Sequence, residues 1–115
     1  MGSAMKRGEI YFAALDPTRG GETQKTRPVV VVSNNAANRS ASVVTVVPLT
    51  SNVDRVFPFE VLLLAARTGL SKDSKAMAQQ VRTLDKTRLN ARAAGELQLG
   101  DMRALDAALR LHLGL

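Results

Sequence analysis

The stretch Arg19–Asn34, RGGETQKTRPVVVVSN, joins a polar, glycine-containing loop to a run of four valines. Val29–Val32 is a short β-branched apolar run bounded by turn-forming residues, which is typical of a strand buried on both faces. Pro28 suits the first position of such a strand, because its missing N–H is not needed there. Arg27 therefore lies where a polar loop meets a core strand, a junction that can hold a long cationic side chain in one place.

Outward from this strand, the pattern predicts several short strands separated by polar segments. Apolar runs place the strands at Lys6–Leu15, Arg27–Asn35, Val43–Leu49, Phe57–Leu64 and Lys75–Leu84. Polar residues, glycine and proline indicate loops or turns at 16–26, 35–42, 50–55 and 66–74. Pro58 within the fourth run favours an edge strand or a bulge.

The last third of the chain changes character from strand to helix. Residues 85–97 predict a helical turn or two, and Asp101 is then expected to cap an amphipathic helix that Gly114 ends. Apolar and aromatic side chains recur at steps of three and four along it, at Met102, Leu105, Leu109 and His112. The predicted class is mainly β (α+β): a small barrel or half-barrel with a C-terminal amphipathic helix against it.

Length and composition limit the possibilities further. The chain has 115 residues, enough for one domain with a modest core. Met1–Ala4 resembles an expression-tag remnant before a natural initiator Met5, so residues 5–115 are expected to form a single domain. There is no cysteine, and no apolar run approaches the ~20 residues that span a bilayer. With no signal peptide after Met5, a cytoplasmic protein is expected.

The charge balance favours a polyanionic partner. Lysine and arginine number 16 against 10 acidic residues, a formal net charge of +6. A basic domain of this size suggests nucleic acid, although many small basic proteins have no such partner.

Most catalytic chemistries lack the residues that they need. The single histidine, His112, lies on the predicted terminal helix, so neither a histidine pair nor a serine triad is available. The acidic residues are scattered without D-x-D, H-E-x-x-H or EF-hand spacing, which argues against a catalytic metal. The G-x-S-x-G and P-loop signatures are absent too, and the pair Gly20-Gly21 alone predicts only a flexible turn.

RNA strand cleavage needs neither a metal nor an imidazole, because the neighbouring 2′-hydroxyl is a built-in nucleophile. An arginine such as Arg27 offers planar donors that match phosphate oxygens. A hydroxyl such as Thr50 can hold a phosphate oxygen, and a carboxylate such as Glu22 can take the 2′-OH proton. Composition and spacing alone do not place these groups together. They indicate no more than a basic β domain that can bind nucleic acid.

Four motifs in register then resemble a known family. MKRGEIYFAALDPTRGGETQKTRPVVVVSNN at 5–35 is followed by TVVPLTS at 45–51, FPFEVLL at 57–63 and AQQVRTLDKTRL at 78–89. Their order and spacing resemble those of the MazF/PemK/Kid toxin endoribonucleases, from Met5 to about Leu111.

This resemblance implies an SH3-like, CcdB/PemK-type barrel of about five to seven strands. It implies a type II toxin that cuts single-stranded RNA, chiefly mRNA, in a sequence-specific and metal-independent way, arresting translation and growth. The products would carry 2′,3′-cyclic phosphate and 5′-hydroxyl ends. No cofactor is implied. The partners would be a second copy of the chain and a MazE-like antitoxin with a disordered acidic tail, the pair also binding DNA.

The resemblance also assigns residues. Arg27, Thr50 and Glu22 are the implied catalytic residues. The candidate RNA contacts are Arg19, Lys25, Tyr11, Gln80, Arg82 and Ser51. Tyr11 and Phe12 alternate on one strand, so at least one of them belongs to the core.

Two other readings remain open from the sequence. Gyrase poisons of the CcdB type share the fold class, but they carry a tryptophan near the chain end, whereas this chain ends RLHLGL and contains no tryptophan. A barrel that binds RNA or an antitoxin without cleaving is the other possibility. Cleavage of RNA in excess EDTA separates a nuclease from both alternatives.

Overall fold

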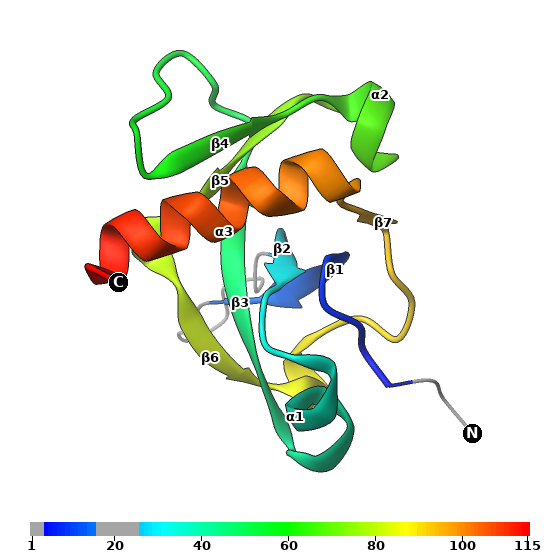
Figure 1. The fold of residues 1–115 in the computed structure, drawn as a ribbon. Helices are drawn as coiled ribbons and strands as arrows, with labels where there is room; N and C mark the ends of the chain where they lie inside the picture. The colour runs from blue at the N-terminus through cyan, green and yellow to red at the C-terminus, as the bar shows by residue number, and fades with distance from the viewer. Residues whose placement is uncertain (1–3, 16–25) are drawn as a thin grey trace, which may run out of the picture.

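The computed structural model describes residues 4–15 and 26–115, in which seven strands form one curled antiparallel sheet (Figure 1). The strands are β1 (Glu9–Ala14), β2 (Thr26–Val31), β3 (Val43–Thr50), β4 (Glu60–Leu63), β5 (Ser74–Met77), β6 (Arg82–Asp85) and β7 (Gly95–Glu96). They are ordered β4-β5-β3-β2-β1-β7, with β6 paired to β3 outside this path. The predicted mainly β half-barrel with a C-terminal helix is confirmed.

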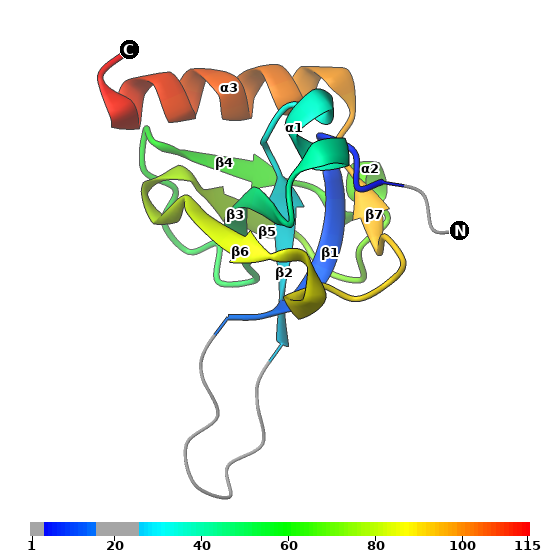
Figure 2. The ribbon, with the colours of Figure 1, turned by 90° about the horizontal axis from the view of Figure 1, so that it is seen from below.

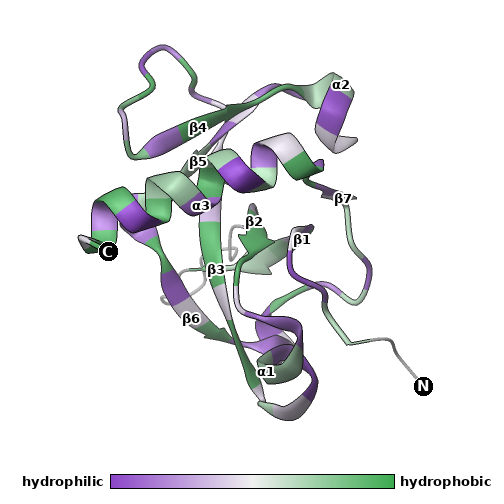
Figure 3. Ribbon diagram, viewed as in Figure 1, coloured by the Kyte–Doolittle hydropathy of each residue, from purple (hydrophilic) through white to green (hydrophobic). Residues whose placement is uncertain are grey.

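The four-valine run lies between two cores, as a strand buried on both faces should. Val30 packs with Ile10 and Leu49 in the core that α3 (Leu99–Leu113) covers. Val29 and Val31 point to the other face, into a second core that includes Tyr11. In Figure 3, β2 is accordingly coloured hydrophobic, whereas α3 alternates between hydrophobic and hydrophilic residues.

Strand β3 is long enough to serve three partners. It pairs with β6 through Val43–Val46, with β2 through Val46–Pro48 and with β5 through its last two residues, Leu49 and Thr50. Because β5 and β6 attach to different parts of the same strand, the sheet must curl around β3. At the end of β3, Thr50 is partly exposed beside the fully buried Leu49.

The prediction of one strand over Lys75–Leu84 is wrong, because the chain turns in its middle. The 3₁₀ turn η1 (Ala78–Gln80) separates β5 from β6. Ala78 is fully buried in this turn, and Val81 packs against the same core, so an apolar pattern continues through the corner. A corner and a continuous strand therefore look alike at the level of hydropathy.

Two shorter segments also differ from the prediction. Residues 35–42, expected as a turn, contain the helix α1 (Asn35–Ser40), which Asn34 caps by accepting from the Ala37 N–H at 2.8 Å. The predicted loop 66–74 begins with the end of the short helix α2 (Ala65–Thr68).

Other elements are shorter than expected. Strand β2 ends at Val31 and β4 begins only at Glu60, so Pro58 lies in the turn before an edge strand. Residues 85–97 hold one 3₁₀ turn, η2 (Lys86–Arg88), and then β7.

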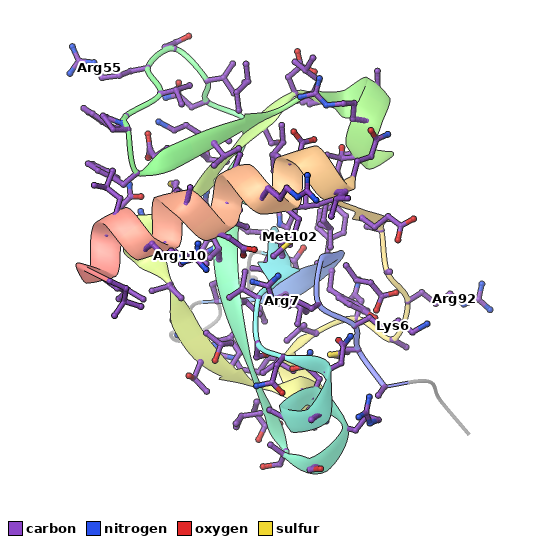
Figure 4. The ribbon with its side chains drawn as sticks, in the orientation of Figure 1. Lys6, Arg7, Arg55, Arg92, Met102 and Arg110 are labelled. Atoms are coloured by element: carbon purple, nitrogen blue, oxygen red, sulfur yellow. The ribbon has the colours of Figure 1, made fainter. Side chains whose placement is uncertain are left out.

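Helix α3 lies along one side of the sheet, buries Leu105 and Ala108 against it, and ends at Gly114 as predicted (Figure 2). Asp101 is not its N-cap; that position belongs to Gln98. The carboxylate of Asp101 instead accepts from Arg67 Nε at 3.1 Å, linking the first turn of α3 to α2. Below α3, Arg7 donates to the carbonyl of Val32 and pairs with Asp106 of the helix (Figure 4). Among the described residues, no helix has the length and apolar character to cross a membrane.

Candidate active site

A cavity of about 810 Å³ opens where β2 begins and β3 ends. Figure 2 shows that this start of β2 lies on the side of the sheet away from α3. The lining residues are Phe12, Thr26, Arg27, Pro28, Leu49, Thr50, Ser51, Gly69, Leu70, Ser71, Lys72, Ser74 and Ala94. Hydroxyl groups and two cations face this space beside one aromatic ring, a mixture suited to a phosphate-containing ligand.

A second cavity of about 370 Å³ adjoins the first and shares Arg27 and Thr50 with it. Its other lining residues are Leu15, Pro48, Met77, Gln80 and Arg82. The shared pair therefore marks the boundary between two hollows, and a chain passing from one to the other has to pass over it.

Strand register explains why Arg27 and Thr50 meet, although they are far apart in the sequence. Strands β2 and β3 are antiparallel, with Val29 opposite Pro48. Continuing this register by two residues places Arg27 opposite Thr50. Directly opposed residues in antiparallel strands share a face of the sheet, so the guanidinium and the hydroxyl point to the same side.

The Thr50 hydroxyl has one role already fixed. Its Oγ1 accepts from the backbone N–H of Asn52 at 3.2 Å. A hydroxyl carries one donor and two acceptor positions, so this bond leaves its proton for an acceptor in the cavity. Arg27 is exposed, and its guanidinium carries hydrogen-bond donors and no acceptor. Both side chains therefore offer donors to an anionic group in the cavities.

The structure brings most of the other described candidates to the same two cavities. Ser51 lines the larger one, and Gln80 and Arg82 line the smaller one. Arg82 donates through Nη1 to the carbonyl of Leu15 at 3.3 Å, and both Gln80 and Arg82 remain exposed. The candidates Arg19, Glu22 and Lys25 lie outside the described residues.

Tyr11 is in the core and lines neither cavity. It is 5% exposed and donates its hydroxyl to Glu9 Oε1 at 2.9 Å. Burial, with the hydrogen bond to Glu9 and the negative charge of Glu9, raises the pKa of Tyr11 to about 12. The candidate RNA contact Tyr11 is therefore buried in the core, whereas Phe12, which the strand's alternation turns outward, lines the larger cavity.

Sequence reasoning missed the far wall of the larger cavity. Ser71 and Lys72 come from the segment between α2 and β5, and Ser74 is the first residue of β5; this part of the chain carried no motif. Its only signal was composition, two serines and a lysine directly before a strand. Within the described ranges, no three histidine, cysteine or acidic side chains gather where they could hold a metal ion.

Relatives and solved structures resemble this chain over nearly its whole length. Residues 6–113 match the family described as PemK-like, MazF-like toxin of type II toxin-antitoxin system. The endoribonuclease MazF9 of Mycobacterium tuberculosis is 49% identical over 116 residues, covering 96% of this chain and 98% of that protein. The endoribonuclease EndoA of Bacillus subtilis is 36% identical, covering 96% of each chain.

A solved structure of similar architecture is a mycobacterial endoribonuclease in complex with its cognate antitoxin. It superimposes with a TM-score of 0.79 at 31% identity, over 97% of each chain. The family match over residues 6–113 includes the residues that line the two cavities. This chain belongs to the PemK-like, MazF-like family of toxins of type II toxin–antitoxin systems.

Proposed function

We propose that this toxin-family endoribonuclease cleaves single-stranded RNA, chiefly mRNA, by attack of a ribose 2′-hydroxyl on the adjacent phosphorus, without a metal ion. The products are a 2′,3′-cyclic phosphate and a 5′-hydroxyl, and the loss of mRNA stops translation in the cytoplasm. The observation that carries this proposal is the shared position of Arg27 and Thr50 between two cavities. A scissile phosphate likewise lies between two nucleosides.

In this mechanism the RNA crosses the boundary pair with one nucleoside in each cavity. Arg27 neutralises the charge that grows on the phosphate oxygens as the pentavalent transition state forms, and Thr50 donates its free proton to one of them. Glu22 takes the 2′-OH proton. The 5′-oxygen of the following nucleotide leaves as the new P–O bond to the 2′-oxygen closes the cyclic phosphate, and it takes a proton from water to become the 5′-hydroxyl.

Sequence preference is assigned to the side chains around the boundary. Gln80 and Arg82 line the smaller cavity, where an amide and a guanidinium can hydrogen-bond to base edges. Ser51 faces the larger cavity, and Phe12, which is 37% exposed, offers a ring for base stacking there. Arg19 and Lys25 are proposed as further phosphate contacts.

The test is cleavage of a long defined RNA in excess EDTA, with the ends mapped by primer extension. Discrete cuts are expected, and a substrate with a single 2′-deoxynucleotide at a mapped cut site is expected to stay intact there, because it lacks the nucleophile. Cutting of the deoxy substrate would overturn the internal-nucleophile mechanism. Binding without any cut would favour an inert RNA-binding barrel.

We also propose two protein partners. One is a second copy of this chain, because the end of α3 and strand β4 leave large apolar side chains exposed at Leu62, Leu111, Leu113 and Leu115. Light scattering should give twice the monomer mass of 12.3 kDa, and Leu111→Glu should lower the measured mass.

The other proposed partner is an antitoxin whose acidic tail complements the net charge of +6.

A further inference from the structure

The loop that follows Thr50 is held by a series of side-chain hydrogen bonds. The backbone N–H of Asn52 donates to Thr50 Oγ1 at 3.2 Å, and the N–H of Asp54 donates to Asn52 Oδ1 at 3.2 Å. Each bond spans two residues, so each fixes only the next step of the chain. The orientation of the Thr50 hydroxyl is therefore tied to the conformation of residues 51–54.

Lys75, on the neighbouring strand β5, holds the middle of this loop. Its Nζ donates to the carbonyl oxygen of Arg55 at 2.5 Å and to Glu60 Oε1 at 2.9 Å. It also lies 5.8 Å from the centroid of the Phe57 ring. Figure 4 shows the Arg55 side chain pointing away from the molecule, so the backbone of Arg55, and not its side chain, is what Lys75 holds.

Glu60 keeps Lys75 in this position. The side chains of Lys75 and Glu60 are only 11% and 2% exposed. Glu60 also accepts from the Phe57 N–H at 3.0 Å and from Gln79 Nε2 at 2.7 Å. Burial raises the pKa of Glu60, but the hydrogen bonds from Phe57, Gln79 and Lys75 outweigh it, and the net pKa is lowered. The carboxylate therefore stays ionised opposite the ammonium group.

The same lysine is the cross-strand neighbour of Thr50. In the pairing of β3 with β5, Thr50 lies directly opposite Lys75. The backbone beside Thr50 and the carbonyl of Arg55 are thus held by one residue. No similar contact from another strand reaches Asn52 or Asp54 among the described hydrogen bonds.

We infer that Lys75 is a positioning residue: by holding the Arg55 carbonyl, it fixes the loop whose Asn52 N–H orients the Thr50 hydroxyl toward the scissile phosphate. This inference rests on the proposed function. Without Lys75, residues 51–55 sample other conformations, the Asn52 bond breaks part of the time, and Thr50 spends less time in the productive rotamer.

The experiment compares cleavage kinetics and thermal stability. Lys75→Met alone leaves Glu60 buried without its partner, which is strongly destabilising. The test variant is therefore Lys75→Met/Glu60→Gln, which removes both charges. We expect folding to be retained, kcat to fall by about tenfold or more, and KM to change by less than about threefold, since misorientation affects the reacting geometry more than binding.

Two controls separate positioning from general loss of stability. Lys86→Met removes an ammonium group that also donates to a backbone carbonyl, that of Asn38; neither residue lines the two cavities, so kcat should be unchanged. Asn38→Ala removes a fully buried polar side chain in α1 and supplies a destabilised reference. If Asn38→Ala lowers kcat as much as the double variant does at an equal loss of Tm, the inference is overturned.

A third comparison isolates the link to Thr50. In a Thr50→Val background there is no hydroxyl to orient, so adding Lys75→Met/Glu60→Gln should change kcat by less than about twofold. Multiplicative losses would overturn the inference, as would wild-type kcat in the double variant. Either outcome leaves the proposed function standing while the wild type cleaves RNA. A wild type that cuts no RNA would instead sink the proposed function itself.

Discussion

At the scale of single residues, Arg27 shows how a strand boundary can hold a cation beside a cavity. Its neighbours Val29 and Val30 are fully buried, while Arg27 itself is exposed in the two cavities. The backbone of Arg27 is held by pairing with Ala13, so only the side chain retains freedom. A preorganised cation of this kind stabilises a developing negative charge without having to be brought into place.

Replacement of Arg27 should therefore cost activity and little stability. Arg27→Ala is expected to lower kcat/KM for RNA cleavage by about 10²-fold or more, the usual cost of one oriented donor. Thermal unfolding should change little, because the side chain is exposed. Arg39→Ala, an exposed arginine of α1, is the matched control and should cleave like the wild type. Near-normal cleavage by Arg27→Ala would remove this residue from the mechanism.

Gly95 is the residue at which stability depends on the absence of a side chain. A Cβ atom built at Gly95 would lie 2.2 Å from the carbonyl oxygen of Thr68, so β7 and the end of α2 would have to separate. Gly95→Ala is expected to destabilise the fold by about 1–3 kcal/mol. Gly100→Ala is the control, since nothing lies within 4 Å of its Cβ and alanine favours the helix by up to ~1 kcal/mol. Urea unfolding of both variants measures the change in the free energy of unfolding, which should fall for Gly95→Ala and rise for Gly100→Ala.

At the residue level, the sequence located the ends of the apolar runs, but alternation along a strand left a choice of face open. Arg27 and Thr50 flank apolar runs, and strand pairing brings them together at the cavities. Tyr11 and Phe12 fit either face equally well by pattern. The structure selects Tyr11 for the core, because Glu9 on the same face accepts its buried hydroxyl.

At the scale of elements, the sequence specified strands better than the turns between them. Apolar runs located β1, β2, β3 and β4, because a buried strand needs a local, continuous pattern. The break between β5 and β6 was invisible, since Ala78 and Val81 remain apolar through the corner. Helix α1 was hidden by its asparagines and serine, which favour turns as much as helix ends.

The buried pair between β4 and β5 should make stability depend on acidic pH. The folded state lowers the pKa of Glu60 below its ordinary 4.5. Its contribution is therefore complete above the unfolded pKa and is lost as the pH falls through the lower, folded value. Chemical unfolding measured from pH 6 to 3 should show this loss, and Glu60→Gln should make it shallower. An identical pH profile for Glu60→Gln would contradict the assignment.

At the scale of the whole molecule, the net positive charge should favour binding to several phosphates along the proposed RNA substrate. Neutralised phosphates release counterions, so the logarithm of the binding constant for a non-cleavable RNA should fall linearly with the logarithm of the salt concentration. Each phosphate contact with a single strand adds about 0.7 to the slope. Arg82→Ala should reduce the slope by about this amount, and Arg39→Ala should leave it unchanged. A slope near zero would exclude phosphate contacts as the main source of affinity.

The architecture was predictable as a whole, because a short chain with several apolar runs and one amphipathic helix has few ways to bury them. The set of residues that line the candidate site was less predictable. The wall formed by Ser71, Lys72 and Ser74 depends on how α2 and β5 lie beside β3, which no local pattern encodes. Register and corner geometry are properties of the folded sheet, and they decide which loops share a cavity.

The pairing of β3 with β2, β5 and β6 also determines the stage of folding at which the candidate site forms. Thr50 gains its neighbour Lys75 only once β5 docks, and Arg27 gains its place beside Thr50 only once β2 docks. A chain emerging from the ribosome thus carries both side chains well before the segment that fixes one of them has been synthesised. Since contacts distant in sequence form late in folding, we expect activity to appear abruptly with the last sheet contacts, and the nascent toxin to be inert until then.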